Sequence, residues 1–234
     1  MNAVAVTNCC NAYKQFCFPK VASRAEIAEM NPNSVLEDYA REAPQLIESF
    51  ERISAADVYA NVAHLLPLRP SRLVDVGAGT GRDAAWFAQL GHSVLAVEPI
   101  EALRIAGMEL HPSTRIVWLS DTLPDLERTL ARGEVFDCVI LCAVWQHLCL
   151  DERARAMPNL ARLLAHDGRI FMVLRHDPPD GQGRVNDSQR EDAEALARDA
   201  GLGLVFACAG KPVHPDSRAS GVTLTWLVFG PAKA

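Results

Sequence analysis

The sequence lacks a long apolar segment, since no run approaches the roughly 20 residues that a helix needs to cross a bilayer. It also lacks a cluster of basic residues. With 29 acidic and 23 basic side chains, its formal net charge is −6. Because nucleic-acid-binding surfaces usually carry a basic footprint, this balance disfavours DNA or RNA as a partner. The sequence therefore predicts neither a membrane protein nor a nucleic-acid-binding protein.

Cysteine pairs with regular spacing are absent too. The seven cysteines are irregularly placed and do not form a disulfide framework, and no matching ligand pairs indicate a metal site. The N-terminus has no charged segment followed by a continuous apolar one, as a secretory signal would. We expect a metal-free protein of the cytoplasm in which residues 1–32 are a poorly structured leader.

Residues 33–66 have the pattern of helices. Ser34-Val-Leu-Glu37 has the form of a capping box, and apolar residues recur at helical spacing as far as Phe50. Pro44 falls within this segment and predicts a kink or a break. A second cap, Ser54-Ala-Ala-Asp57, predicts another helix that ends near residue 65.

Residues 67–234 alternate between strand and helix patterns, which predicts right-handed crossovers and a mostly parallel sheet in one α/β domain. Strands are expected near 72–76, 93–97, 115–119, 135–141 and 169–174, with helices near 82–90, 100–108, 123–131 and 151–165. A last long helix is expected at 188–200, followed by strands at 202–208 and 222–229.

The most informative stretch is Leu73-Val-Asp75-Val-Gly-Ala-Gly-Thr-Gly81. Its apolar part is typical of a buried parallel strand, and the three glycines are typical of a turn into the helix that follows. Such a turn lets a ligand approach the backbone closely. The spacing differs from the G-x-G-x-x-G of dinucleotide-binding proteins. An acidic residue, Glu98, ends the next apolar run, where its carboxylate can accept hydrogen bonds from both hydroxyls of a ribose.

This combination of Asp75, three glycines and Glu98 resembles the class I S-adenosylmethionine (SAM)-dependent methyltransferases. The resemblance implies a Rossmann-like fold with a seven-stranded sheet, an antiparallel strand at its end, helices on both faces and N-terminal lid helices. It also implies SAM as the cofactor, with S-adenosylhomocysteine as the product.

The resemblance assigns cofactor contacts to residues that follow the strands. Gly77, Gly79 and Gly81 would contact the cofactor, with the last two under the methionine part and the ribose, and Asp75 would act on the methionine amino group. The alternative for Asp75 is a buried carboxylate that caps backbone amides. Arg82 could contact the SAM carboxylate or remain solvated.

Two later strand ends complete the expected cofactor site. Asp121 and Thr122 match the position that meets adenine, although either could instead cap the next helix. Cys142 is small enough for the methyl donor to lie against the backbone.

Four residues are candidates for the acceptor side. His147 could serve as a general base, orient the substrate or have a structural role. Tyr39 could belong to the lid or pack on the sheet edge, and Trp145 could form a wall of the acceptor pocket or pack in the core. Arg175 could bind a carboxylate or phosphate of the acceptor, or close its loop through a salt bridge.

The resulting hypothesis is methyl transfer to an O or N atom of a small molecule by in-line displacement. The alternatives are a tRNA- or protein-modifying methyltransferase, a SAM-fold enzyme of other chemistry such as aminopropyl transfer, a SAM-binding protein without turnover, and a NAD-dependent oxidoreductase. The sequence does not indicate the acceptor or the oligomeric state.

Overall fold

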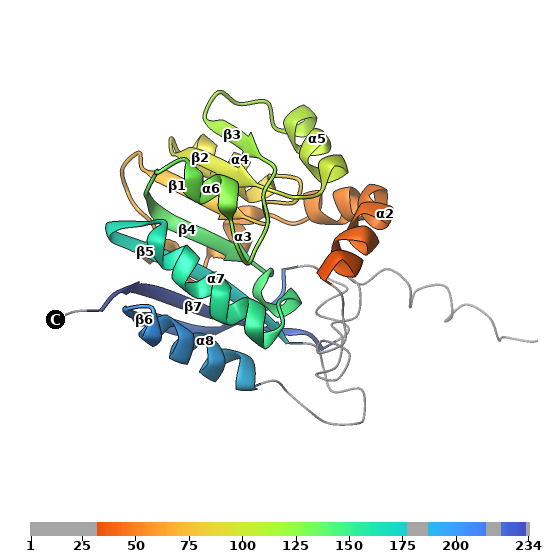
Figure 1. The fold of residues 1–234 in the computed structure, drawn as a ribbon. Helices are drawn as coiled ribbons and strands as arrows, with labels where there is room; N and C mark the ends of the chain where they lie inside the picture. Colours follow the sequence, from red (N-terminus) through yellow and green to blue (C-terminus); the bar gives the residue numbers. More distant parts are fainter. Residues whose placement is uncertain (1–31, 177–186, 214–220, 233–234) are drawn as a thin grey trace, which may run out of the picture.

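The computed structural model describes residues 32–176, 187–213 and 221–232. Its centre is one seven-stranded sheet in the order β3-β2-β1-β4-β5-β7-β6 (Figure 1). Strand β7 runs antiparallel to both of its neighbours, and the other adjacent pairs are parallel. The strands are β1 (Arg72–Val76), β2 (Ser93–Val97), β3 (Ile116–Leu119), β4 (Phe136–Cys142), β5 (Leu164–His176), β6 (Leu202–Gly210) and β7 (Thr223–Pro231).

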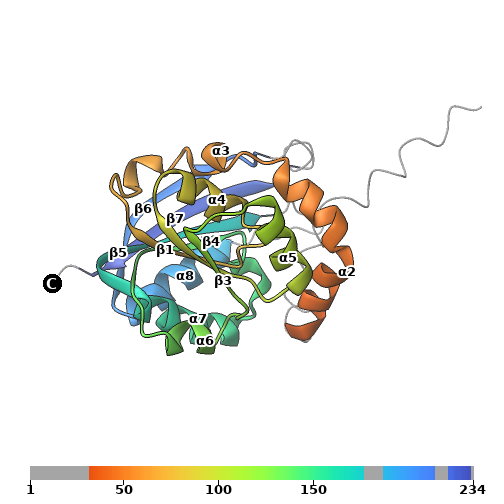
Figure 2. The same cartoon turned by 90° about the horizontal axis from the view of Figure 1, so that it is seen from above.

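Helices cover both faces of this sheet (Figure 2). Side chains of α3 and α4 pack on one face, and side chains of the segments around α6, α7 and α8 pack on the other. The helices are α2 (Pro32–Glu51), α3 (Ala55–Tyr59), α4 (Arg82–Gln89), α5 (Glu101–Leu110), α6 (Glu127–Ala131), α7 (Leu150–Arg162) and α8 (Asp187–Asp199), with the 3₁₀ turns η1 (Ala63–Leu65) and η2 (Trp145–His147). Within these ranges, no helix has the length and apolar character needed to span a membrane.

The predicted Rossmann-like architecture is confirmed, and the differences lie in the boundaries of elements. Strand β5, predicted near 169–174, begins at Leu164, where the helix predicted at 151–165 has already ended. The predicted helix at 123–131 begins only at Glu127, because Leu126 has a left-handed conformation with φ of 48°. The helix predicted from Ser54 is divided into α3 and η1. The Ser54 cap itself is present, since its hydroxyl oxygen accepts a hydrogen bond from the backbone N–H of Asp57. The predicted leader at 1–32 lies outside the described residues, except that Pro32 begins α2.

Helix α2 is continuous through Pro44, so the predicted break is wrong, and its start at Pro32 precedes the predicted cap at Ser34. Apolar packing explains its continuity, since Ala43 and Leu46 are buried against Ile100 and Leu103 at the start of α5. Tertiary packing of this kind outweighs the one backbone hydrogen bond that a proline removes.

The last residue of α2 connects the helix to two other elements. The carboxylate of Glu51 accepts a hydrogen bond from the Thr80 hydroxyl in the glycine turn. It also lies 3.0 Å from Nε2 of His111, at the end of α5. These polar contacts fix the C-terminal end of α2 against the strand ends.

Trp118 of β3 is inserted between the glycine turn and α5. A Cβ on Gly107 would lie 2.3 Å from the indole and 2.6 Å from the carbonyl oxygen of Thr80, and a Cβ on Gly81 would lie 2.6 Å from the same indole. Both glycines are therefore required by close packing of the protein on itself.

We predict that Gly107→Ala lowers the free energy of unfolding by about 1–3 kcal/mol, because the added methyl group overpacks the contact with the Thr80 backbone. The better helix propensity of alanine offsets at most about 1 kcal/mol of this. Urea denaturation measures the change. Glu109→Ala, on the exposed side of the same helix, is the control and should alter stability by about 0.5 kcal/mol or less. A Gly107→Ala protein as stable as the wild type would contradict the packing argument.

Candidate active site

The glycine turn after β1 is held against the end of β2. The backbone N–H groups of Gly77 and Ala78 both donate to the carbonyl oxygen of Val97, at 2.8 and 3.0 Å. Gly77 has φ of +76°, and a Cβ there would lie 2.6 Å from the Val144 side chain. Only glycine therefore allows the turn to pass this close to the loop after β4.

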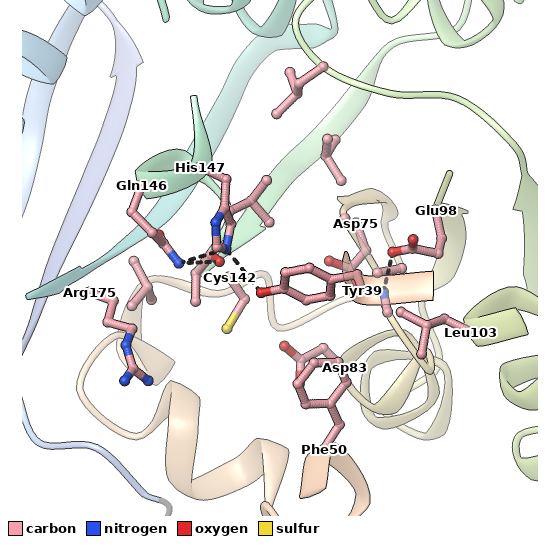
Figure 3. A pocket seen from close by; sticks show the side chains of 18 of the residues that line it. Tyr39, Phe50, Asp75, Asp83, Glu98, Leu103, Cys142, Gln146, His147 and Arg175 are labelled. Atoms are coloured by element: carbon pink, nitrogen blue, oxygen red, sulfur yellow. Dashed lines mark hydrogen bonds between the residues drawn. The ribbon is translucent and has the colours of Figure 1, made fainter. Parts of the chain in front are cut away.

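Glu98 ends β2 and fixes the next part of the turn. One carboxylate oxygen accepts from the N–H of Gly79 and the other from the N–H of Ile100, both at 2.8 Å. The residue is 4% exposed. Burial raises the pKa of Glu98, and the two backbone N–H groups oppose this effect. The carboxylate lies beside the cavity described below (Figure 3).

Asp75 is the most isolated acidic group of the site. It is 2% exposed, and its Oδ2 has no hydrogen-bond partner among the described residues. Burial and the charge of Asp83 raise the pKa of Asp75 well above its ordinary value, while Arg82 opposes them. The alternative that this carboxylate caps backbone amides does not account for the unpartnered oxygen.

Arg82 and Asp83 form a buried pair at the start of α4. The Arg82 Nε donates to Oδ1 of Asp83 at 2.7 Å, and the Tyr59 hydroxyl donates to the other oxygen at 2.9 Å. The Arg82 side chain is 16% exposed, so it is not the solvated residue of the alternative interpretation. Although burial disfavours the charge of Arg82, the neighbouring Asp83 raises its pKa.

Asp121 follows β3, and its carboxylate holds the start of α6. Oδ2 accepts from the backbone N–H and the hydroxyl of Thr129, both at 2.7 Å, and Oδ1 accepts from the N–H of Thr122 at 3.0 Å. This is the capping role left open by the sequence. The hydrogen bond to Oδ1 also occupies the backbone N–H of Thr122, the second residue that the resemblance assigned to adenine.

The loop after β4 places His147 opposite α2. The Tyr39 hydroxyl of α2 lies 3.1 Å from Nε2 of His147, and the two rings meet edge to face (Figure 3). The Gln146 amide nitrogen donates to the carbonyl oxygen of Ala143 and lies 3.4 Å from the same Nε2. Because the Ala143 oxygen can only accept, the nitrogen of the Gln146 amide is the atom that faces both groups.

These residues surround a cavity of about 490 Å³ at the carboxyl ends of the strands. Of the predicted site residues, it is lined by Tyr39, Asp75, Gly77, Gly79, Arg82, Glu98, Asp121, Thr122, Cys142, His147 and Arg175.

Two predicted site residues lie elsewhere. Gly81 does not line the cavity, and its packing against Trp118 accounts for a glycine at this position. Trp145 is 0% exposed within the core beneath η2, so the alternative of core packing describes it. We therefore omit Gly81 from the cofactor contacts and Trp145 from the acceptor wall.

Several lining residues were not identified from the sequence. Phe50 and Val58 come from the N-terminal helices, Gln146 precedes His147, and Lys211 and Leu224 come from the ends of β6 and β7. Lys211 follows the expected strand at 202–208 by three residues, and directly follows the observed β6. Among the described residues, no group of three or more His, Cys, Asp or Glu side chains could hold a metal ion.

Comparison with known sequences gives two partial matches. The methyltransferase domain family matches residues 74–172. An uncharacterised methyltransferase of Mycobacterium tuberculosis is 30% identical over 110 residues, which are 47% of this chain and 42% of the relative. The match thus spans less than half the length of this curated relative.

Comparison with solved structures covers most of the chain. The Burkholderia thailandensis 1,6-didemethyltoxoflavin N1-methyltransferase, crystallised with 1,6-didemethyltoxoflavin and S-adenosylhomocysteine, is 22% identical with a TM-score of 0.66, covering 91% of this chain and 92% of that one. The magnesium protoporphyrin IX methyltransferase of Synechocystis, crystallised with SAM, is 15% identical with a TM-score of 0.60, covering 87% and 98%. At these identities the likeness concerns the fold. Residues 74–172 are thus similar to the methyltransferase domain family, and the chain has the fold that SAM-dependent methyltransferases share.

Proposed function

We propose that the chain binds SAM in the cavity at the strand ends and transfers its methyl group to an O or N atom of a small-molecule acceptor. The observation that carries this proposal is the pair of buried carboxylates, Asp75 and Glu98, that open onto the glycine turn. The match of residues 74–172 to the methyltransferase domain family, and the SAM and S-adenosylhomocysteine present in similar folds, support it.

The unpartnered Oδ2 of Asp75 suits the ammonium group of the methionine moiety. A buried carboxylate without a partner is costly, and a bound cation would supply the missing interaction. Arg82 lies beside it but already donates to Asp83 and to the carbonyl oxygen of Phe50. We therefore assign Arg82 to holding Asp83 next to the cofactor.

The ribose and adenine contacts use acceptors with remaining lone pairs. Each oxygen of Glu98 accepts one backbone N–H and can accept a second donor, such as a ribose hydroxyl. Oδ1 of Asp121 likewise accepts only from Thr122 and can accept an exocyclic amine. In this arrangement adenine recognition relies on the Asp121 carboxylate, since the Thr122 N–H is already used.

Bound SAM would supply a methyl group already activated by the sulfonium, so that the protein needs mainly to align the acceptor and exclude water. Alignment of this kind is worth about 7–11 kcal/mol. His147 is suited to remove the proton of an acceptor hydroxyl or amine, because it lines the cavity and its Nε2 lies beside the Tyr39 hydroxyl. The acceptor would replace the Tyr39 hydroxyl at this nitrogen.

Cys142 does not compete for the methyl group. Burial raises the pKa of the Cys142 thiol, and the charge of Asp83 adds to this effect. The thiol therefore stays protonated at neutral pH, and the thiolate that would act as a nucleophile is scarce. Cys142 is thus a small lining residue that is compatible with a methyl donor beside it.

Calorimetry with SAM and S-adenosylhomocysteine, followed by transfer of label from methyl-labelled SAM to a low-molecular-mass cell extract, tests the proposal. We expect both ligands to bind and label to enter a small molecule. Binding of NAD in place of SAM would overturn it, and transfer of label to tRNA or protein alone would overturn the small-molecule acceptor.

We predict that Asp75→Asn weakens S-adenosylhomocysteine binding at least about tenfold, because the amide cannot pair with the ammonium group. Since the pKa of Asp75 is raised in the folded protein, wild-type affinity should increase as pH rises and the carboxylate ionises; the variant should lose this dependence.

The same substitution separates binding from stability. A raised pKa in the folded state means that ionisation of Asp75 destabilises the ligand-free protein as pH rises. The melting temperature of ligand-free Asp75→Asn should therefore equal or exceed that of the wild type at pH 8. Asp167→Asn, an exposed change of the same chemistry, should alter neither property. Wild-type affinity in Asp75→Asn would remove this residue from the cofactor site.

We predict that His147→Gln lowers kcat by about 10²–10⁴-fold, the usual contribution of a general base, while S-adenosylhomocysteine affinity changes little. The wild-type rate should fall at low pH as the base becomes protonated, and this low-pH limb of the pH–rate profile should disappear in the variant. Tyr39→Phe should keep the limb because it leaves the imidazole in place. His166→Gln, at an exposed histidine, is the control. An unaltered pH–rate profile in His147→Gln would exclude His147 as the base.

A further inference from the structure

We propose that the acceptor is an anionic small molecule with an apolar body, whose carboxylate or phosphate group binds between Arg175 and Lys211. This inference rests on the proposed function and names the substrate class of the same cavity. It is carried by the way in which charge is distributed along the cavity wall.

The cavity has ends of opposite charge. Acidic residues come from the ends of β1, β2 and β3, from the loop before α6 and from the starts of α4 and α7: Asp75, Asp83, Glu98, Asp121, Asp125 and Glu152. Two arginines line the same end, but Arg82 is paired with Asp83 and Arg155 with Asp125, so that acidic groups remain in excess there. On the side formed by β5, β6 and β7, the charged residues that line it within the described ranges are Arg175 and Lys211. Figure 3 shows Arg175 and Glu98 on opposite sides of the Tyr39 ring. A cationic ligand such as SAM suits the first end, and an anion suits the second.

Strand register brings the two cations together. Arg175 on β5 pairs with Leu224 on β7, and Leu224 pairs in turn with Gly210, which precedes Lys211. Adjacent strands lie about 4.8 Å apart, so the backbones at Arg175 and Gly210 are separated by roughly 10 Å. Two long cationic side chains at this spacing can reach one anionic group from both sides.

The lysine is unusual in this chain. The sequence has only four lysines, and Lys211 is the one that falls within the described residues. Other cationic positions in the described ranges are arginines, many of them paired with carboxylates on the surface. The placement of Lys211 at the cavity, in a protein of net charge −6, marks a local site for negative charge.

Apolar side chains also line the cavity near Arg175. Val173 precedes Arg175 by two residues on β5, and Leu224 pairs with Arg175 on β7. With Val58 and Val222, which line the same cavity, they suit a hydrocarbon or aromatic body. Burial raises the pKa of the Tyr39 hydroxyl, and the charge of Arg175 opposes this effect. The charge of Arg175 therefore acts on the Tyr39 hydroxyl, which contacts His147. Since Arg175 and His147 line the same cavity, a single small acceptor can place its anionic group at Arg175 and its nucleophile at His147.

The test separates a low-molecular-mass cell extract into anionic, neutral and cationic fractions by ion exchange at pH 7. Each fraction is incubated with the full chain and methyl-labelled SAM. We expect label to enter the anionic fraction. Label only in the neutral or cationic fraction would overturn the inference, and no label in any fraction while S-adenosylhomocysteine binds would overturn the proposed turnover on which it rests.

Variants then test the two cations with the labelled fraction. Arg175→Gln should raise KM for the acceptor at least tenfold with a smaller change in kcat, and Lys211→Gln should raise it about threefold or more. Arg175→Lys should recover part of the loss. Arg162→Gln, which removes the same charge from the exposed side of α7, should leave KM unchanged. S-adenosylhomocysteine affinity and the melting temperature establish that each variant is folded. An unchanged KM in both folded Gln variants would exclude the anion site.

Discussion

The hydrogen bond between the Gly79 N–H and the Glu98 carboxylate is the constraint on which the rest of the site depends. It joins the turn after β1 to the end of β2, two segments that are distant in sequence. The second oxygen of the same carboxylate accepts from Ile100 and so sets where α5 begins. Because the group is buried, loss of this bond would leave a carboxylate and a backbone amide without partners, which is costly. Helix α5 in turn seats α2 through Leu103, and α2 carries Tyr39 to His147. One carboxylate thus connects the positions of the glycine turn, α5 and α2.

Local patterns in the sequence predicted the parts of the fold that depend on local physics. The buried strand, the glycine turn and α4 follow from apolar periodicity and from glycine positions that allow positive φ, and the structure has them at the predicted residues. The start of α6 could not be predicted in this way. It depends on the left-handed conformation of Leu126 and on the Asp121 carboxylate reaching Thr129, a contact that no residue pattern encodes.

The site was predictable where a strand end determines the direction of a side chain, as at Asp75 and Glu98. Elsewhere, residues near a strand end can face the core or the cavity. Trp145 and His147 are two positions apart in the same short turn, yet the first packs in the core and the second lines the cavity. Gly81 illustrates a related ambiguity, since a glycine required by a neighbouring indole has the same sequence pattern as one required by a ligand. The net charge also gave no indication of Lys211 after β6, because it averages over the whole surface.

Because α2 is attached at its C-terminal end, a rotation around that end displaces residues near its N-terminus the most. Glu51 is held by Thr80 and His111, and Tyr39 lies twelve residues nearer the N-terminus, which corresponds to about 18 Å along the helix axis. A rotation of about 10° around the Glu51 end would displace Tyr39 by about 3 Å, as much as the present distance between its hydroxyl and His147. A small change of angle at the Glu51 end would therefore be enough to separate the Tyr39 hydroxyl from His147 and to open the imidazole to the cavity.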